Sequence, residues 1–392
     1  MIPFNLGKLP RIYFGPGKLA ELPRLISESA RNVLIITGAT SFYGSEKWKN
    51  LTDELNGRNV DYFHEIVSGE PSPEQVDEIA DRYREKGLGL VAAIGGGSVI
   101  DAGKAISAML PKTGTVRQYL EGFSNAISHD GAKTPFIAVP TTAGTGSEAT
   151  KNAVLGHVGP DGLKRSIRHD NFVPDISIID PELAVSCPPP VTATSGMDAF
   201  VQLLESYVST GANELTDALA LSGLEQVQDC LAAAYRDGNN MDARSGMAYA
   251  ALMSGITLSH AGLGVVHGFA SVLGGLFNIP HGVICGTLIG AATRTNIRYL
   301  KETGAGHPFL EKYAKAGAIL AGREYSPENR DDYLDFLAQQ LDEWTKTFRL
   351  PRLGALGIGF HDVGRIIPRV GNKNNPVALD REGIKSILIA GI

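Results

Sequence analysis

The sequence pattern changes at a proline run, SCPPP, which occupies residues 186–190. Before the run, apolar stretches of strand length alternate with amphipathic segments such as 73–86; the stretches are NVLIITG (32–38), GLVAAIGGG (89–97) and TPFIAVPTT (134–142). Fully apolar strands that alternate with helices are typical of a mostly parallel sheet covered on both faces. After the run, strand signals nearly vanish and the apolar period of helices appears at 191–209, 214–236, 243–262, 282–298, 308–321, 328–346 and 380–390. We therefore predict the α/β fold class, with a parallel-sheet domain at 1–188 followed by an all-helical domain at 189–392.

Composition excludes several classes of protein. The 392 residues carry a net charge of −6 and show no basic stripe with interleaved aromatic residues, so we expect no nucleic-acid partner. No apolar run is long enough to span a bilayer and the N-terminus lacks a signal pattern, so we expect no membrane association. The cysteines, Cys187, Cys230 and Cys285, lie far apart; this favours a reducing cytoplasm, and their spacing does not indicate a zinc cluster.

Glycines follow the second apolar stretch, at the point where a helix is expected to begin. Such glycines let backbone amides and the positive end of a helix approach a pyrophosphate, although a tight strand-to-helix turn can also exist without a ligand. A loop of hydroxyls and glycines follows the next strand, and two such loops on one sheet edge favour a dinucleotide, NAD or NADP. The candidate cofactor residues are Gly95, Gly96, Gly97, Ser98 and Asp101 in the first loop and Thr141, Thr142 and Thr145 in the second.

The loop after the first apolar stretch bears on the choice between NAD and NADP. It offers Gly38 and Ser41 as further cofactor contacts, and the usual G-x-G-x-x-G pattern is absent. In dinucleotide folds, an acidic residue near a strand end grips the adenosine ribose and repels a 2′-phosphate. Residues 33–44 contain no carboxylate, so this loop does not obviously exclude NADP.

A candidate metal site lies in the helical half. Asp198 and Gln202 are four residues apart in a helical pattern, so their side chains share one face. Residues 259–286 add His260, His267 and His281, although a single histidine on an apolar helix is more often a core residue. A carboxylate with imidazoles suits Fe²⁺ or Zn²⁺, and we expect no thiolate among the ligands.

Several motifs, in their order along the chain, resemble one known family. GGGSVIDAGK (95–104), PTTAGTGSE (140–148), IIDPEL (178–183), SGMDA (195–199), VHGFA (266–270) and PHG (280–282) are similar to motifs of the iron-containing, group III alcohol dehydrogenases. The resemblance covers nearly the whole chain. It implies a dinucleotide-binding domain, a helical domain, a homodimer, and hydride transfer between NAD or NADP and a small alcohol or aldehyde, with one divalent metal in the cleft.

The resemblance also assigns roles to individual residues. Asp198, His267 and His281 match three metal ligands of the family, whereas Gln202 and Ser271 stand at positions that are usually histidine. The two glycine and threonine loops match the family's cofactor loops. Asn152 and Lys164 match positions near the nicotinamide and the substrate, and Gly38 stands where members that prefer NAD often carry aspartate.

The two substitutions leave alternatives open. Asp198, His267 and His281 alone can hold Fe²⁺, or the metal is lost and Gln202 binds substrate directly, as in a metal-independent reductase resembling maleylacetate reductase. A nucleotide-binding protein without turnover is a third reading, and a lyase resembling dehydroquinate synthase ranks lower because its basic substrate contacts are not identified. With Ser271 in place of a histidine, a water, a ribose hydroxyl or His260 would have to relay the proton.

Overall fold

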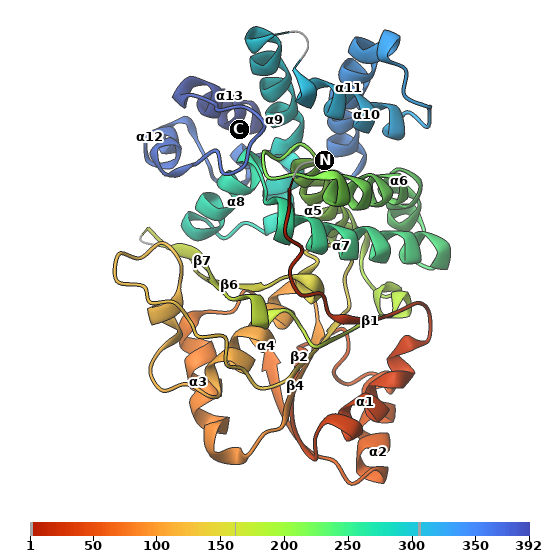
Figure 1. Cartoon of the computed structure of the whole chain (residues 1–392), viewed down its shortest axis with the longest axis vertical. Helices are drawn as coiled ribbons and strands as arrows, with labels where there is room; N and C mark the ends of the chain where they lie inside the picture. The colour runs from red at the N-terminus through yellow and green to blue at the C-terminus, as the bar shows by residue number, and fades with distance from the viewer. Residues whose placement is uncertain (1–2, 161, 305–306) are drawn as a thin grey trace.

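The N-terminal half forms a parallel sheet. In the computed structural model, which describes residues 3–160, 162–304 and 307–392, six strands pair in the order β1-β8-β5-β4-β2-β3, and every pairing in this sheet is parallel (Figure 1). The strands are β1 (Arg11–Phe14), β2 (Asn32–Gly38), β3 (Asp61–Val67), β4 (Leu90–Gly95), β5 (Phe136–Pro140) and β8 (Ile176–Ile179). The three strands predicted from the sequence are β2, β4 and β5, which lie at the centre of the sheet.

Helices cover both faces of this sheet, as predicted. Helices α1 (Leu22–Ser29) and α2 (Glu46–Gly57) pack on the face that carries Val33 and Ile35. Helices α3 (Pro73–Tyr83) and α4 (Gly97–Met109) pack on the face that carries Leu34 and Ile36. Successive residues of a strand point to opposite faces, so a strand buried on both sides must be apolar throughout, and this explains the unbroken run in β2.

An antiparallel hairpin was not predicted. Strands β6 (Asn152–His157) and β7 (Leu163–Arg168) pair with each other and not with the main sheet. Strand β6 packs on α4 and strand β7 packs on the helical half, so the hairpin lies where the two halves meet (Figure 1). Polar residues interrupt both segments, and this removed the apolar signal that marks the central strands.

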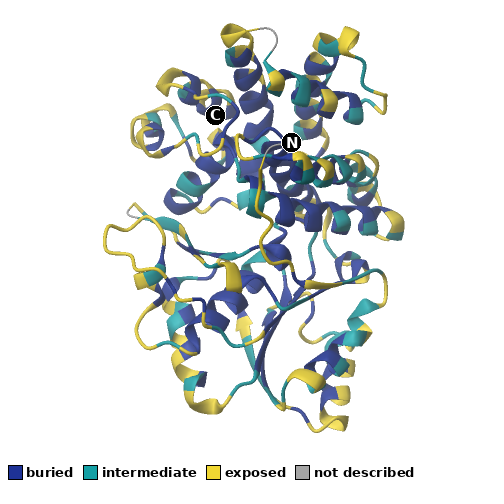
Figure 2. Cartoon of the chain, in the orientation of Figure 1, coloured by how far each residue is buried: buried dark blue, intermediate teal, exposed yellow. Residues whose placement is uncertain are grey.

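The C-terminal half is helical in its described residues, so the predicted fold class is confirmed. Its α-helices are α5 (Pro189–Tyr207), α6 (Glu214–Arg236), α7 (Met241–Ala261), α8 (Val265–Leu276), α9 (His281–Thr303), α10 (Pro308–Leu320), α11 (Arg330–Thr347), α12 (Val363–Ile366) and α13 (Arg381–Gly391). Helix α5 lies at the centre, packed against α6, α7 and α9, and is buried along most of its length (Figure 2). Prolines 189 and 190 occupy its first turn, where a missing amide proton costs nothing.

In the described part of the helical half, the sequence pattern missed α8 and the four-residue helix α12. The residues of α8, VVHGFASVLGGL, are almost entirely apolar or small, so no polar face marks a helical period.

Among the described residues, no single helix is long and apolar enough to cross a membrane. Helices α7 and α8 taken together reach the required length and hydropathy, but the chain bends by 100° between them.

Candidate metal centre and nucleotide loops

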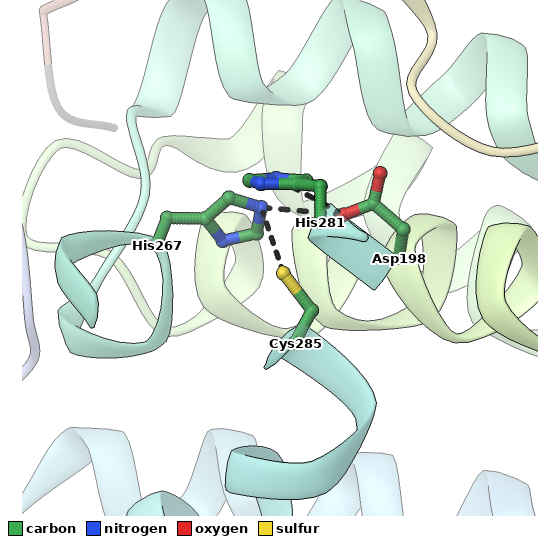
Figure 3. Close-up of side chains that lie close together, drawn as sticks. All are labelled: Asp198, His267, His281 and Cys285. Carbon is green, nitrogen blue, oxygen red and sulfur yellow. Dashed lines mark hydrogen bonds and ion pairs between the residues drawn. The ribbon is translucent and has the colours of Figure 1, made fainter. Parts of the chain in front are cut away.

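Four side chains from three helices converge on one point in the helical half (Figure 3). Asp198 comes from α5, His267 from α8, and His281 and Cys285 from α9. Oδ1 of Asp198 lies 3.5 Å from Nε2 of His267 and 3.6 Å from Nε2 of His281. One donor atom from each of the four residues lies within 4.8 Å of the other three. The structure thus brings together the three residues that the sequence analysis proposed as ligands, and adds a fourth.

The fourth residue, Cys285, corrects the sequence analysis. The expectation of a candidate ligand set without sulfur was wrong, because the Cys285 thiol lies in the cluster. Cys285 is four residues after His281 on α9, so the two side chains share a helix face. Its Sγ lies 3.9 Å from Nε2 of His267. The H-x-x-x-C spacing was the signal that could have identified it.

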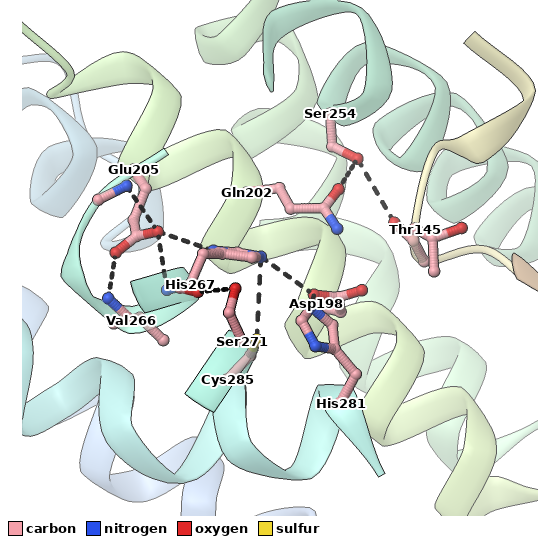
Figure 4. Close-up of polar contacts among 12 residues, drawn as sticks. Thr145, Asp198, Gln202, Glu205, Ser254, Val266, His267, Ser271, His281 and Cys285 are labelled. Carbon is pink, nitrogen blue, oxygen red and sulfur yellow. Dashed lines mark hydrogen bonds and ion pairs between the residues drawn. The ribbon is translucent and has the colours of Figure 1, made fainter. Parts of the chain in front are cut away.

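Glu205 holds His267 in place (Figure 4). It lies on α5, seven residues after Asp198, and its Oε2 accepts a hydrogen bond of 2.7 Å from Nδ1 of His267. Because Nδ1 donates to Glu205, Nε2 faces the cluster, where a bound cation would take the place of the proton on this nitrogen. Metal-binding histidines characteristically donate their other ring N–H to such a carboxylate.

One oxygen of Asp198 has no hydrogen-bond donor among the described residues. Asp198 is 2% exposed, yet its Oδ1, the oxygen that faces both histidines, has no hydrogen-bond partner. A buried carboxylate oxygen without a donor is costly, so such an atom calls for an explanation. A cation between the four side chains would provide one, and the donor set of carboxylate, imidazole and thiol suits a divalent transition metal.

The protonation states of the cluster show which protons a cation would replace. Burial opposes a charge on His267, but Cys285, Asp198 and Glu205 raise the pKa of its imidazole well above the ordinary value, so without a cation His267 carries a second proton on the nitrogen that faces Asp198. Burial opposes ionisation of Asp198, but the two histidines beside it, of which His267 carries the charge, hold the pKa of this carboxyl below its ordinary value. Burial lowers the pKa of His281 to about 3, so its imidazole is neutral and can donate a lone pair. Burial also raises the pKa of the Cys285 thiol to about 11, so a cation would have to displace a proton from it.

Two predicted site residues are engaged elsewhere. Gln202 is buried one turn after Asp198, and its Oε1 accepts a hydrogen bond of 2.7 Å from Ser254 of α7 (Figure 4). The oxygen that would bind a metal is therefore held by another helix. The Ser271 hydroxyl donates to the backbone carbonyl of His267 at 2.8 Å.

His260 is a backbone anchor in the structure. Its Nδ1 lies 2.7 Å from the carbonyl of Ile256, and its Nε2 lies 2.9 Å from the amide of Gly7 in the N-terminal segment. A proton on Nδ1 satisfies both contacts, because Nε2 then accepts from Gly7. His260 could take a substrate proton only by losing the contact with Gly7, which argues against the proton relay suggested from the sequence.

The first glycine loop has the geometry expected of a pyrophosphate site. Gly95 ends β4, Gly96 is the N-cap of α4, and Gly97 and Ser98 open the helix. Among the described residues, no side chain caps this end, so the backbone amides are available to an anion. A Cβ on Gly97 would lie 2.5 Å from Cγ2 of Thr145, so only glycine allows the two loops to pack this closely.

The second loop runs from the sheet to the metal-site helices. The Thr141 amide donates to the carbonyl of Gly95 at 2.9 Å, which aligns the loops, and Thr142 lies against Gly96. Further along, Gly144 packs on Ser195 of α5 and Gly146 packs on Gly255 of α7. One stretch of backbone therefore connects the proposed pyrophosphate loop to α5, which carries Asp198 and Gln202, and to α7, which carries the Ser254 partner of Gln202.

Two buried charged residues of α4, Lys104 and Asp101, hold the backbone after the second loop through hydrogen bonds. The Lys104 ammonium of α4 donates to the carbonyls of Ser147, Thr150 and Asn152 and to the Thr150 hydroxyl at 2.8–2.9 Å. Oδ2 of Asp101 accepts from the Val154 amide at 3.0 Å and so ties α4 to β6. Asp101, a candidate cofactor residue in the sequence, thus contacts the backbone of the hairpin in the structure. The sequence analysis did not identify Lys104.

The remaining predicted residues occupy the sheet edge and the hairpin. Gly38 ends β2, and Ser41 is exposed in the turn after it. Asn152 opens β6, and its Oδ1 is buried without a hydrogen-bond partner among the described residues. Lys164 of β7 forms an ion pair with Glu70, and its Cδ lies 3.0 Å from the position that a Cβ on Gly274 of α8 would occupy.

Comparisons with known proteins cover the whole chain. Residues 10–181 match the family model described as "Iron-containing alcohol dehydrogenase", and residues 192–391 match "Fe-containing alcohol dehydrogenase family, C-terminal". The chain is 33% identical over 389 residues to alcohol dehydrogenase 4 of Saccharomyces cerevisiae (strain YJM789), covering 97% of this chain and 96% of the yeast protein. It is 36% identical over 293 residues to 1,3-propanediol dehydrogenase of Citrobacter freundii, covering 73% of each. A crystal structure of 1,3-propanediol oxidoreductase matches it with a TM-score of 0.88 and 26% identity over 100% of both chains.

Proposed function

This chain belongs to the iron-containing alcohol dehydrogenase family and is an alcohol oxidoreductase, and we propose that it transfers a hydride between NAD or NADP and a small alcohol or aldehyde with the help of a divalent metal. The observation that carries the metal part of the proposal is the buried Oδ1 of Asp198, which faces two imidazoles and has no hydrogen-bond donor among the described residues. Asp198, His267 and His281 would hold the metal, with Fe²⁺ as the first candidate and Zn²⁺ as the second.

Each part of the site would have a separate task. When bound, a divalent metal supplies Lewis acidity toward an alcohol or carbonyl oxygen, and the nicotinamide supplies or accepts the hydride. The amides at the start of α4 would bind the pyrophosphate, and the Thr141–Thr145 loop would guide the nucleotide toward α5 and α7. Glu205 would orient His267, and Asn152 and Lys164 of the hairpin would contact the nicotinamide or the substrate.

We further propose that NADP is accepted. Gly38 at the end of β2 has no side chain, and a Cβ there would be 3.6 Å from Val99, an ordinary contact distance. A carboxylate at this strand end would repel a 2′-phosphate, so its absence from residues 33–44 favours tolerance of NADP. A homodimer in a reducing cytoplasm remains part of the proposal, and the three free cysteines are compatible with that compartment.

The test combines metal analysis with a substrate panel. Protein purified without oxygen should contain close to one divalent metal per chain and should oxidise primary alcohols or diols, or reduce the matching aldehydes, with NAD(H) or NADP(H). Asp198→Asn should lose both the metal and the activity. Full activity in metal-free protein would support a metal-independent reductase instead. Tight NAD(P)H binding with no turnover across the panel would support a nucleotide-binding protein without catalysis.

A further inference from the structure

Besides one carboxylate and two imidazoles, the cluster contains a thiol, that of Cys285. Cys285 is completely buried, and its thiol faces Nε2 of His267, the nitrogen that also faces Asp198 (Figure 3). The three other members of the cluster lie around it. We propose that Cys285 is a metal ligand and that it, and not Gln202, completes the coordination set with Asp198, His267 and His281. This inference rests on the metal part of the proposed function and extends it.

The distances fit one tetrahedral ion. Bonds of about 2.0–2.1 Å to nitrogen and oxygen, at a tetrahedral angle, place such donor atoms about 3.4 Å apart, and a sulfur bond of about 2.3 Å places sulfur about 3.6 Å from nitrogen. The corresponding distances are 3.5 and 3.6 Å from Asp198 Oδ1 to the two imidazoles, and 3.9 Å from Cys285 Sγ to His267 Nε2. These three distances are within about 0.3 Å of the tetrahedral values, and all four donor atoms lie within 4.8 Å of one another.

Gln202 fits the same role less well. Its Oε1 lies 2.7 Å from the Ser254 hydroxyl, whose single proton can go either to this oxygen or to the carbonyl of Ala251 at 2.8 Å. Turning the amide oxygen toward the metal would break this buried contact between α5 and α7. Cys285 would lose its proton on binding a metal, but it would break no contact with another part of the protein, because its thiol contacts His267 and Asp198, which are themselves members of the cluster.

The exchange of ligand would change the metal preference and the charge of the site. A carboxylate and a thiolate together neutralise a divalent ion, whereas a carboxylate and an amide leave one positive charge in a buried position. Thiolate is a soft ligand, so the set favours ions that accept sulfur, such as Zn²⁺, Co²⁺ and Fe²⁺, over Mg²⁺ or Ca²⁺. The site would select a thiophilic transition metal.

Cobalt spectroscopy tests the ligand directly. The full-length protein is stripped with a chelator, loaded with Co²⁺ without oxygen, and examined by absorption spectroscopy. We expect a sulfur-to-cobalt charge-transfer band in the near ultraviolet together with the visible bands of tetrahedral Co²⁺. Cys285→Ser should lose the charge-transfer band, whereas Cys230→Ser, which alters a thiol on α6 away from the cluster, should keep it.

X-ray absorption at the cobalt edge of the unaltered protein is a second measurement that needs no variant. One sulfur at about 2.3 Å is expected. Bound cobalt without sulfur in its coordination sphere, or a charge-transfer band that survives in Cys285→Ser, would overturn the thiolate inference while leaving the metal proposal standing. Failure of the unaltered protein to bind Co²⁺, Zn²⁺ or Fe²⁺ would overturn both.

Discussion

Oε2 of Glu205 lies 2.7 Å from Nδ1 of His267, and the two oxygens of the same carboxylate accept the amides of Gly264 and Val266 at 2.9 and 2.7 Å. One side chain from α5 therefore serves as the cap at the start of α8 and fixes the ring of a candidate ligand on that helix. Helix α8 lacks a polar face of its own. The hydrogen bonds of Glu205 fix the start of α8 against α5, the central helix of the helical half.

Replacing Glu205 by Gln should weaken metal binding. The amide keeps the size of the side chain but can offer only one oxygen to the donors that now share the carboxylate, so His267 loses its fixed orientation. Loss of such a partner typically costs 10–100-fold in metal affinity. Competition with a coloured chelator measures the change for Zn²⁺. Glu225→Gln, at an exposed position on α6, is the control, and equal affinities in the two variants would contradict the role given to Glu205.

The contact between the two nucleotide loops leads to a second prediction. A Cβ on Gly97 would meet the Thr145 side chain at 2.5–2.6 Å, so Gly97→Ala must push the second loop away from the first. We expect NAD(P)H affinity to fall by about tenfold or more, equivalent to about 1.4 kcal/mol, as followed by the fluorescence of the reduced cofactor. Gly364→Ala in α12, where a Cβ meets nothing within 4 Å, should bind as the unaltered protein does. Unchanged binding in Gly97→Ala would remove this loop from the cofactor site.

Cofactor preference can be altered at one position. Gly38→Asp places a carboxylate at the end of β2, where space exists for a side chain. The carboxylate should repel a 2′-phosphate and accept a hydrogen bond from a ribose hydroxyl, so the ratio of kcat/KM for NADPH to that for NADH should fall. Gly38→Asn has the same shape without the charge and should change the ratio less. A ratio that moves equally in both variants would indicate a steric effect.

The sequence predicted those parts of the fold whose signal is local. Strands β2, β4 and β5 are buried on both faces, so an unbroken apolar run marks each of them. The hairpin β6–β7 has no such run, because it lies outside the main sheet and carries charged residues such as Lys164 and Arg168. Helix α8 was missed because its partners, Glu205 among them, are supplied by distant segments.

In the candidate metal site too, contacts between distant segments could not be predicted from local sequence patterns. The positions of Asp198, His267 and His281 were proposed from motifs, and these three side chains do lie together. The H-x-x-x-C spacing places Cys285 on the same helix face as His281, but no local pattern shows that Asp198 and His267, on two other helices, lie at that face. The hydrogen bond from Ser254 to Gln202 joins two helices and no pattern within either helix indicates it.

The last prediction concerns stability and pH. Glu148 follows the second nucleotide loop and is 3% exposed; burial raises the pKa of its carboxyl to about 7, although Lys104 acts in the opposite direction. The ordinary value in an unfolded chain is about 4.3. Between these two values, the unfolded chain has lost the proton and the folded chain keeps it. The contribution of Glu148 to stability is therefore fully present below about pH 4, decreases as the pH rises, and is lost above about pH 7.

Glu148→Gln removes this dependence while keeping a neutral side chain of similar size. The variant and the unaltered protein should have similar melting temperatures near pH 4.5, and the variant should melt at a higher temperature near pH 8. The shift in pKa limits the gain to about 4 kcal/mol. Thermal unfolding across the pH range measures it, with Glu225→Gln as the exposed control. A variant that is less stable at pH 8 than at pH 4.5, relative to the unaltered protein, would mean that Glu148 is ionised in the fold and forms a stabilising pair with Lys104.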